Sequence, residues 1–329
     1  MAIKAGGRAA LLRHRALVYR DPGEYASVIS GVMRSGLVDG ARVYAVVPGD
    51  RHDGLRAALG HHGEDLEFVD MTSLGANPAR IIPAIEALTA GEPRPLRVVT
   101  EPIWPGRTAA EIREATRHEA LINLAFAGRD VQILCPYDAA RLPGAVLADA
   151  RRTHPQVTGS EGIAASEGFA GAGRLPASCT APLPPRPAGA AALTFDGDLR
   201  GVRDFIAARV GASDLPASRA AELVLAVSEV AANTLKHAGG RGTVWCWQAP
   251  GEVICELRDG GHIADPLAGR RLPEADQVGG HGLWLVNRCV DLTEVRSTMD
   301  GTVTRLHVRQ SGDPEASGQL GGLADTRAM

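Results

Sequence analysis

The stretch AAELVLAVSEVAANTLKHA, residues 220–238, decides how the C-terminal half of this chain is interpreted. Its apolar residues, Val227 and Val230 among them, recur at helical spacing, which predicts a helix with one face packed on a sheet. Glu229 and Asn233 lie four residues apart and share another face. A carboxylate can orient or accept a proton, and an amide oxygen can bind a hard cation such as magnesium, so the pair suits an active site. The same spacing is also common on solvated helix surfaces.

Two glycine-containing segments follow this helix. Asp259, Gly260 and Gly261 end an alternating, strand-like run, and the sequence GGHGL at residues 279–283 opens another apolar helix. Glycine lets backbone amides approach a phosphate closely, and the start of a helix adds partial positive charge. Turns also use glycine for geometry alone, so the order of the segments is more informative than either segment.

An Asn on a helix, Asp-x-Gly after a strand and Gly-x-Gly-Leu before a helix, in this order, resemble the N, G1 and G2 boxes of the GHKL ATPase superfamily. Within it, the strings SEVAANTLKHA and GTVTRL are most similar to the anti-sigma factor serine/threonine kinases. The resemblance covers residues 193–310 and implies the Bergerat fold. Hairpin-like segments around residues 250–251 and 300–301, mixed with helices, independently predict a two-layer α/β sandwich.

The resemblance also implies roles for individual residues, with ATP and Mg2+ as cofactors. Asn233 corresponds to the magnesium ligand, and Glu229 to the residue that helps to deprotonate the attacking hydroxyl. Asp259 would accept a hydrogen bond from the adenine amino group, with Thr302 supporting it. Lys236 would neutralise phosphate charge, although an exposed lysine near a helix C-terminus is common anyway. The remaining cofactor-binding positions are Gly261, Gly279, Gly280, Gly282 and Leu283.

A loop at residues 262–278, between the two glycine segments, contains two prolines and the pair Arg270 and Arg271. Loops of this length are usually functional or mobile, so it is interpreted as an ATP lid. Either arginine can reach phosphate or an acidic partner surface, and plain solvated charge explains the pair equally well. The tail, residues 311–329, is predicted to be disordered.

The first half alternates short apolar runs with amphipathic stretches, which predicts a three-layer domain with a parallel sheet covered by helices. The turn after its second strand, PGDRHD at residues 48–53, lacks the phosphate-binding GxxxxGK[ST] pattern. The predicted strands are 16–19, 42–47, 66–69, 96–100 and 131–135, and the predicted helices are 24–35, 54–61, 78–89, 109–127 and 139–151.

Several strings in this half resemble the MEDS sensory domain, over residues 12–155. They include LVY at residues 17–19, EPIW at residues 101–104 and CPYD at residues 135–138. That family is similar in fold to RecA-type domains without the phosphate loop, and it implies sensing of a small, hydrocarbon-derived ligand. A histidine at the start of the chain and a tryptophan in a loop also have purely structural explanations. The candidate sensory pocket comprises His14, Trp104, Glu119 and Tyr137.

Residues 156–192 are rich in Gly, Ala, Ser and Pro and contain few large apolar side chains. Such a stretch cannot bury enough surface to offset the entropy of ordering, so it is predicted to be a flexible linker. A conventional sensor histidine kinase would carry a helical hairpin with a phosphoacceptor histidine here. The prolines at residues 182–187 argue against that hairpin.

Composition narrows the class of protein. A chain of 329 residues fits two domains, and its net charge of −3, with both signs interspersed, gives no polybasic footprint for nucleic acid or membrane. No apolar run is long enough for a signal sequence or a membrane helix, so a cytoplasmic protein is expected. The five cysteines show no CxxC spacing, which indicates neither a zinc site nor a disulfide framework, and they are interpreted as core residues.

These patterns predict an ATP-binding protein serine/threonine kinase of the anti-sigma type. It would phosphorylate an anti-sigma antagonist and control a sigma factor in response to a signal at the N-terminal domain. Two alternatives stay open, namely an atypical sensor histidine kinase and a non-enzymatic, ATP-gated partner-binding switch. The resemblance also implies a homodimer, for which the residues themselves give no pattern.

Overall fold

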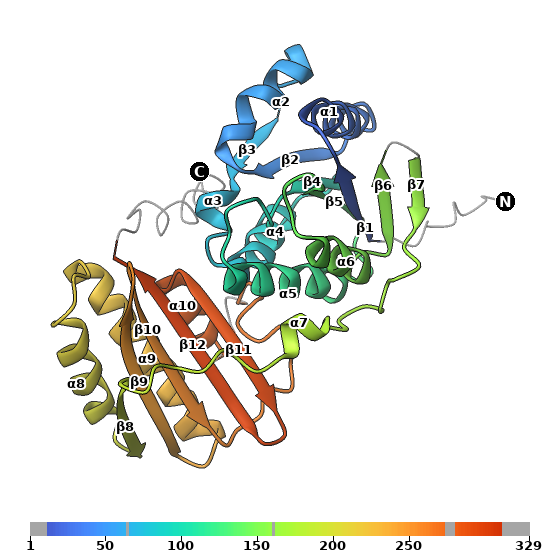
Figure 1. Ribbon diagram of the computed structural model, residues 1–329. Helices are drawn as coiled ribbons and strands as arrows, with labels where there is room; N and C mark the ends of the chain where they lie inside the picture. The colour runs from blue at the N-terminus through green and yellow to red at the C-terminus, as the bar shows by residue number, and fades with distance from the viewer. Residues whose placement is uncertain (1–11, 64–65, 160–161, 274–279, 311–329) are drawn as a thin grey trace. The chain divides into compact units, whose positions relative to one another are not determined.

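The computed structural model describes residues 12–63, 66–159, 162–273 and 280–310 (Figure 1). The tail that was predicted to be disordered, residues 311–329, lies outside the described residues.

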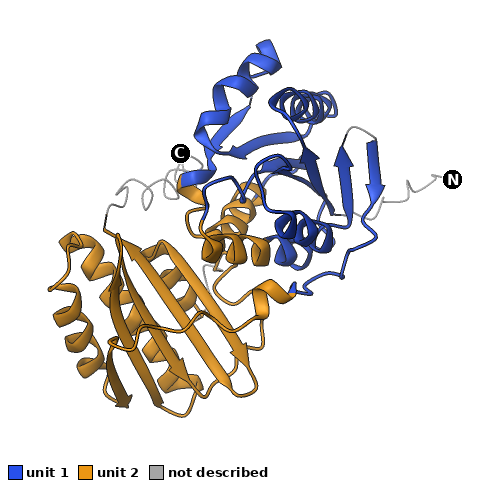
Figure 2. Ribbon diagram, viewed as in Figure 1, with its two compact units in different colours: residues 1–72, 91–107, 119–176 blue, residues 73–90, 108–118, 177–329 orange. Residues whose placement is uncertain are grey.

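The chain divides into two compact units that interleave in sequence (Figure 2). Two segments from the N-terminal half of the chain therefore belong to the same unit as the C-terminal half. Unit 1 comprises Met1–Thr72, Gly91–Arg107 and Glu119–Pro176, and unit 2 comprises Ser73–Ala90, Thr108–His118 and Ala177–Met329.

Unit 1 is built on a seven-stranded sheet with the order β3-β2-β4-β5-β1-β6-β7. Every neighbouring pair is parallel except β6 and β7, which form an antiparallel edge. The strands are β1 (Arg13–Tyr19), β2 (Arg42–Val47), β3 (Glu67–Asp70), β4 (Leu96–Thr100), β5 (Val131–Asp138), β6 (Gln156–Gly159) and β7 (Gly162–Ala165).

Helices cover both faces of this sheet. Leu17 packs with Ile29 of α1 (Pro22–Val38) and Leu55 of α2 (His52–Leu59) in one core cluster. His14 is three residues from Leu17 on the same strand, so it lies on the opposite face. There it contacts Asn123 of α5 (Ala109–Ala125). Helix α6 (Gly144–Thr153) ends at Thr153, whose carbonyl accepts a hydrogen bond from Asn123. Short 3-10 turns occur at Gly49–Arg51 and Gly60–Gly63.

Unit 2 is a two-layer sandwich with an antiparallel sheet in the order β11-β12-β10-β9-β8. One core cluster joins the helices to one face of the sheet, with Val227 and Val230 packed among Val244, Leu257 and Leu306. The elements are β8 (Ala191–Asp196), α8 (Leu199–Val210), α9 (Ala217–His237), β9 (Arg241–Ala249), β10 (Glu252–Asp259), α10 (Gly282–Cys289), β11 (Leu292–Thr298) and β12 (Gly301–Arg309).

The predicted fold class is confirmed, with a three-layer, parallel-sheet α/β unit and a two-layer α/β sandwich. Unit 2 additionally contains helix α4 (Ile81–Thr89), the 3-10 turn Pro78–Arg80, the first part of α5 and the short helix α7 (Ala177–Thr180), and α3 (Met71–Leu74) spans the boundary between the units. Among the described residues, no helix combines the length and the apolar character that crossing a bilayer requires.

The stretch 156–192 differs from the flexible linker that its composition predicts. Strand β6 extends the sheet of unit 1 by pairing with β1, and β8 begins the sheet of unit 2. Between them, Arg305 donates to the Pro184 carbonyl at 2.7 Å, and Arg186 stacks on Trp245 at 3.9 Å. Contacts from distant strands therefore order a segment that has little apolar surface of its own.

Candidate functional site

Helix α9 carries the two polar residues that the sequence pattern singled out. Its buried face, with Val227 and Val230, packs into the core of unit 2, and Glu229 and Asn233 are half-buried beside that core. A Cβ atom placed at Gly282, the first residue of α10, would lie 3.1 Å from Glu229 Oε2 and 3.5 Å from Asn233 Nδ2. The carboxylate and the amide therefore both face the beginning of α10, and any larger residue at position 282 would crowd them.

Asp259 ends strand β10, and its carboxylate is held from two sides. Its Oδ2 atom accepts a hydrogen bond from the Thr234 hydroxyl at 2.6 Å, and Oδ1 accepts one from the Gly261 N–H at 2.8 Å. Thr302 lies opposite Asp259 in the ladder and donates to the Gly261 carbonyl at 2.8 Å. Each carboxylate oxygen can accept more than one hydrogen bond, so Asp259 is fixed and still able to accept one from a ligand.

Thr234 and Ser297 are site residues that the sequence pattern missed. Thr234 is fully buried, and Ser297 Oγ lies 2.8 Å from Thr302 Oγ1 and accepts the N–H of Ile263. A hydroxyl on the buried face of α9 was a usable signal, because buried polar groups need partners. No comparable signal existed for Ser297, since its contacts join segments that are distant in sequence.

A cavity of about 480 Å³ lies beside these residues. This volume falls within the roughly 300–1,000 Å³ that is typical of small-molecule sites. Val230 and Ile263 give the cavity apolar surface, whereas Lys236 and Arg271 give it positive charge. Of the predicted cofactor-binding residues, Asn233, Lys236, Asp259, Gly261, Gly280, Gly282, Leu283 and Thr302 line the cavity, and Gly279 lies outside the described residues.

The donor set of this cavity fits a nucleotide with a magnesium ion. The amide oxygen of Asn233 is a hard ligand of the kind that Mg2+ accepts. The positive charges of Lys236 and Arg271 suit the negative charge of a polyphosphate. A fixed carboxylate, Asp259, beside apolar surface matches a base that carries an amino donor. Gly280 has φ of 83°, in the region that favours glycine, so the backbone before α10 adopts a turn that other residues would strain.

The segment that was interpreted as a lid is held by residues of the N-terminal half that belong to unit 2. The buried guanidinium of Arg270 donates to Glu114 at 2.7 Å, and the N–H of Leu272 donates to Glu86 at 2.8 Å. Arg271, by contrast, is exposed and lines the cavity. Of the two arginines, Arg271 is therefore the one placed to contact a ligand. Residues 274–279 of this segment lie outside the described residues.

In unit 1, three of the four candidate sensory residues lie together. His14 Nε2 is 3.0 Å from Glu119 Oε2, and the rings of Tyr137 and His154 pack edge to face at 5.7 Å. Burial, reinforced by His154, lowers the pKa of His14 to about 4. Burial opposes ionisation of Glu119, but contacts with His154 and His14 outweigh it and hold the pKa of that carboxyl well below its usual range. Cys135 Sγ is 3.2 Å from the same Glu119 oxygen.

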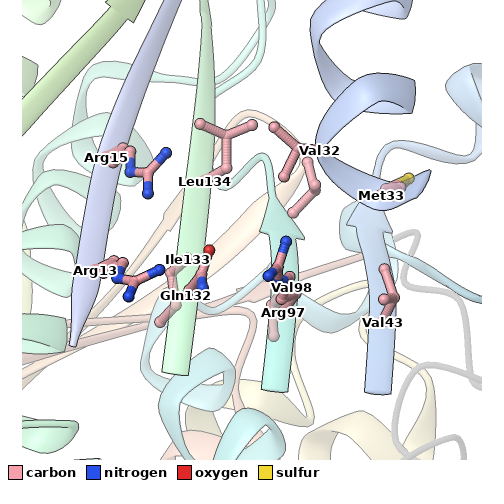
Figure 3. A pocket seen from close by; sticks show the side chains of 11 residues that line it. Arg13, Arg15, Val32, Met33, Val43, Arg97, Val98, Gln132, Ile133 and Leu134 are labelled. Carbon is pink, nitrogen blue, oxygen red and sulfur yellow. The ribbon is translucent and has the colours of Figure 1, made fainter. Parts of the chain in front are cut away.

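Trp104, the fourth candidate, stacks with Arg107 at 4.1 Å from its ring. A separate cavity beside Met33 has Arg13, Arg15 and Arg97 among its lining residues (Figure 3). Its volume of about 20 Å³ suits one water molecule rather than an organic ligand. This small cavity therefore provides no sensory pocket.

Comparisons with known proteins match the two halves of the sequence to two different families. Residues 13–155 match the model of the methanogen/methylotroph DcmR sensory domain (MEDS), and residues 194–308 match that of the histidine kinase-like ATPase domain. The chain thus contains both domains. None of the curated proteins compared with the chain matches it. A solved structure, the RsbU and RsbW domains of Rv1364c from Mycobacterium tuberculosis, is similar over 37% of this chain and 33% of that one, with 20% identity and a TM-score of 0.28.

Proposed function

We propose that this chain is an ATP-dependent protein serine/threonine kinase of the anti-sigma type, acting in the cytoplasm. It phosphorylates a serine of an anti-sigma antagonist and thereby controls a sigma factor, and its MEDS domain receives the signal. The proposal is supported most directly by one arrangement, in which Glu229 and Asn233 face the start of α10 beside a cavity that also contains Asp259.

Each residue has a role in this reaction that follows from its chemistry. Bound ATP would supply the phosphoryl group, and its Mg2+ ion would neutralise the charge that develops on the phosphate oxygens during transfer. Asn233 would hold the metal, and Asp259, fixed by Thr234, would select a base with an amino donor. Lys236 and Arg271 would bind phosphate oxygens. Glu229 would orient the incoming hydroxyl and accept its proton.

The lid contacts supply a route for regulation. Glu86 and Glu114 lie in the N-terminal half of the sequence, yet they bond to Leu272 and Arg270 on the segment that borders the cavity. A signal that moves either carboxylate would change how the cavity is covered. Nucleotide affinity would then depend on the state of residues far from the ATPase motifs in sequence.

The experiment measures Mg·ATP binding by calorimetry and phosphoryl transfer with radiolabelled ATP and candidate antagonists. Asp259→Asn should abolish binding, because the carboxylate becomes an amide at the atoms that hold the base. Glu229→Ala should retain binding and lose transfer. Asp204→Ala, at an exposed position on α8 outside the cavity lining, is the matched control and should keep both activities.

Failure of the wild-type protein to bind Mg·ATP would overturn the whole proposal. Binding without transfer to any antagonist would remove the kinase and leave the ATP-gated switch, which the anchored lid favours. In that case partner regulation should survive Glu229→Ala. An acid-labile phosphohistidine on the chain would instead indicate a histidine kinase, although His154 is a poor acceptor because it is fully buried.

A further inference from the structure

Four potential metal ligands from four separate elements meet in the interior of unit 1. They come from β1, α5, β5 and the residue that follows α6. Their donor atoms all lie within 4.8 Å of one another, and all four residues are buried. We call this group the buried cluster, and it comprises His14, Glu119, Cys135 and His154.

The second nitrogen of each imidazole is already engaged as a donor. His14 Nδ1 lies 3.2 Å from Asn123 Oδ1, and the amide nitrogen of Asn123 is committed to the Thr153 carbonyl at 2.8 Å. His154 Nδ1 lies 2.8 Å from the Ala150 carbonyl. When Nδ1 is the protonated nitrogen of each ring, the Nε2 lone pair points into the cluster. This arrangement is the one that orients histidine ligands in metal sites.

With this tautomer, the cluster contains more hydrogen-bond acceptors than donors. His14 Nε2 and His154 Nε2 lie 3.0 and 3.3 Å from Glu119 Oε2, and His154 Nε2 makes no hydrogen bond among the described residues. The thiol of Cys135 supplies one proton, which Glu119 Oε2 can accept at 3.2 Å. Facing acceptors in a fully buried site are costly unless a proton or a metal cation lies between them.

The spacing of the donors is close to the edges of a tetrahedron around a small cation. Typical bond lengths of about 2.0–2.3 Å to Zn2+ imply ligand–ligand distances of about 3.3–3.6 Å. Four of the six donor pairs lie near these lengths, at 3.0 Å for His14 to Glu119, 3.2 Å for Cys135 to Glu119, 3.3 Å for His154 to Glu119 and 3.5 Å for Cys135 to His14, and the other two pairs lie within 4.8 Å.

We propose that the buried cluster binds one divalent transition-metal ion of the Zn2+ type. Two imidazoles, a thiolate and a carboxylate form a mixed N, S and O set, which suits Zn2+ or Co2+ better than the all-oxygen preference of Mg2+ and Ca2+. A thiolate and a carboxylate carry two negative charges, so the site with a divalent ion is neutral overall. Binding releases the Cys135 proton to solvent.

A catalytic thiol is a poor explanation of the same residues. His14, Cys135 and His154 are all 0–1% exposed, so no substrate reaches the sulfur without unfolding. The remaining alternative is a hydrogen-bonded core in which protons take the place of the metal. That alternative predicts no metal and no spectroscopic signature.

The test uses the full chain purified from cells grown with added zinc or cobalt, because a closed site takes up metal as it folds. Metal content is measured by mass spectrometry, and the cobalt form is examined for thiolate-to-cobalt charge transfer. About one metal per chain and a charge-transfer band are expected. Cys135→Ser should lose the band, and His154→Gln should lower metal content at least tenfold. Cys289→Ser, at a buried thiol in unit 2, should change neither.

Calorimetric ATP binding by each variant monitors the integrity of unit 2, and circular dichroism monitors the fold as a whole. Folded wild-type protein with less than about a tenth of a metal ion per chain after growth in both metals would overturn the proposal. A charge-transfer band that persists in Cys135→Ser would overturn it as well. If Cys135→Ser or His154→Gln does not fold, the wild-type metal content and cobalt spectrum still decide. Metal content and the cobalt spectrum are independent of ATP binding and of phosphoryl transfer, so the kinase proposal can fail while this one holds.

Discussion

Glu101 is a buried carboxyl at the end of β4, and its surroundings disfavour its charge. The side chain is 1% exposed and accepts a hydrogen bond from the Tyr25 hydroxyl at 2.9 Å. Burial raises the pKa of Glu101 to about 7, although Tyr25 and the nearby Arg51 act in the opposite direction. Because the ordinary pKa is 4.5, the folded chain retains a proton here that the unfolded chain has released.

This difference predicts that unit 1 loses stability as pH rises. Between pH 4.5 and about 7 the folded state binds more protons at Glu101 than the unfolded state does, so the stabilisation is full below pH 4.5 and lost above pH 7. The loss is about 3 kcal/mol at most. Glu101→Gln should remove this pH dependence, whereas Glu167→Gln, at an exposed site, should keep it. Hydrogen exchange of the β4 amides between pH 5 and 8 measures the effect.

Thr234 gives a second prediction at the scale of one atom. Its hydroxyl donates to Asp259 Oδ2 at 2.6 Å, and the residue is fully buried. Thr234→Val keeps the shape and removes the donor, so Asp259 is less firmly held. A hydrogen bond to a charged group contributes about 1.5–3 kcal/mol, and a loss of that size corresponds to roughly tenfold to hundredfold weaker Mg·ATP binding by calorimetry. Thr243→Val, which breaks a surface hydroxyl pair with Thr194, is the control. Equal affinities for both variants would contradict the role of Thr234.

At the scale of elements, periodicity located the regular structure well. All five strands and five helices predicted in the first half are present, because short apolar runs and amphipathic stretches were bounded by turn residues. Strand β8 was missed, since half of its residues are exposed and its order depends on pairing with β9. The boundaries predicted for the two domains stay predictions.

Some residues of the two candidate sites could be predicted from the sequence, and others could not. The glycine positions around the cavity were readable because their residue order is distinctive, whereas Thr234 and Ser297 depend on tertiary contacts. Cysteine spacing gave no zinc signal, and the buried cluster explains why, since its donors come from four separate elements. Metal motifs are detectable in sequence only when neighbouring residues supply the ligands.

Helix α10 ends on carbonyl groups that α10 itself cannot satisfy, and Arg80 binds them. Its guanidinium donates to the carbonyls of Asn287, Arg288 and Val290 at 2.8–2.9 Å, and Asn77 adds a contact at 3.1 Å. The last carbonyls of a helix need such partners when they are buried. Residues from the N-terminal half of the sequence therefore complete an element of the ATPase domain.

Replacing this arginine should destabilise unit 2. Arg80→Met removes the hydrogen-bond donor from three carbonyls. We expect the free energy of unfolding of unit 2 to fall by about 2–4 kcal/mol. Urea unfolding followed by tryptophan fluorescence measures it, because three of the four tryptophans, at positions 245, 247 and 284, lie in unit 2. Arg200→Met, at a side chain that is 91% exposed, should cost less than about 0.5 kcal/mol. A loss no greater than that of the control would mean that solvent satisfies the carbonyls.

At the scale of the whole molecule, helix α5 is shared between the compact units. Its residues up to His118 belong to unit 2, and those from Glu119 onward belong to unit 1. Glu114, which bonds to the lid, and Glu119, which belongs to the buried cluster, are five residues apart on this helix. The two positions therefore lie on one continuous helix that belongs partly to each unit.

The lid contact of Glu114 gives the last prediction. This fully buried carboxylate accepts hydrogen bonds from Arg270 at 2.7 Å and from Arg296 at 2.9 Å. Glu114→Gln removes the charge that anchors the lid and leaves two buried guanidinium groups without it. We expect Mg·ATP binding to weaken about threefold to tenfold, and proteolysis within residues 262–273 to become faster.

Glu111→Gln is the matched control, because Glu111 lies on the same helix and pairs with Arg309 rather than with the lid. It should change neither ATP affinity nor lid proteolysis. Urea unfolding of both variants separates loss of the fold from loss of the lid contact. If Glu114→Gln is folded and its ATP affinity has changed, the change is attributed to the lid and the residues that hold it. Unchanged affinity and proteolysis in that folded variant would show that the lid is held by Glu86 and by Asn287 of α10, whose amide donates to the Gly269 carbonyl at 2.8 Å. The regulatory route would then have to pass through α4 instead of α5.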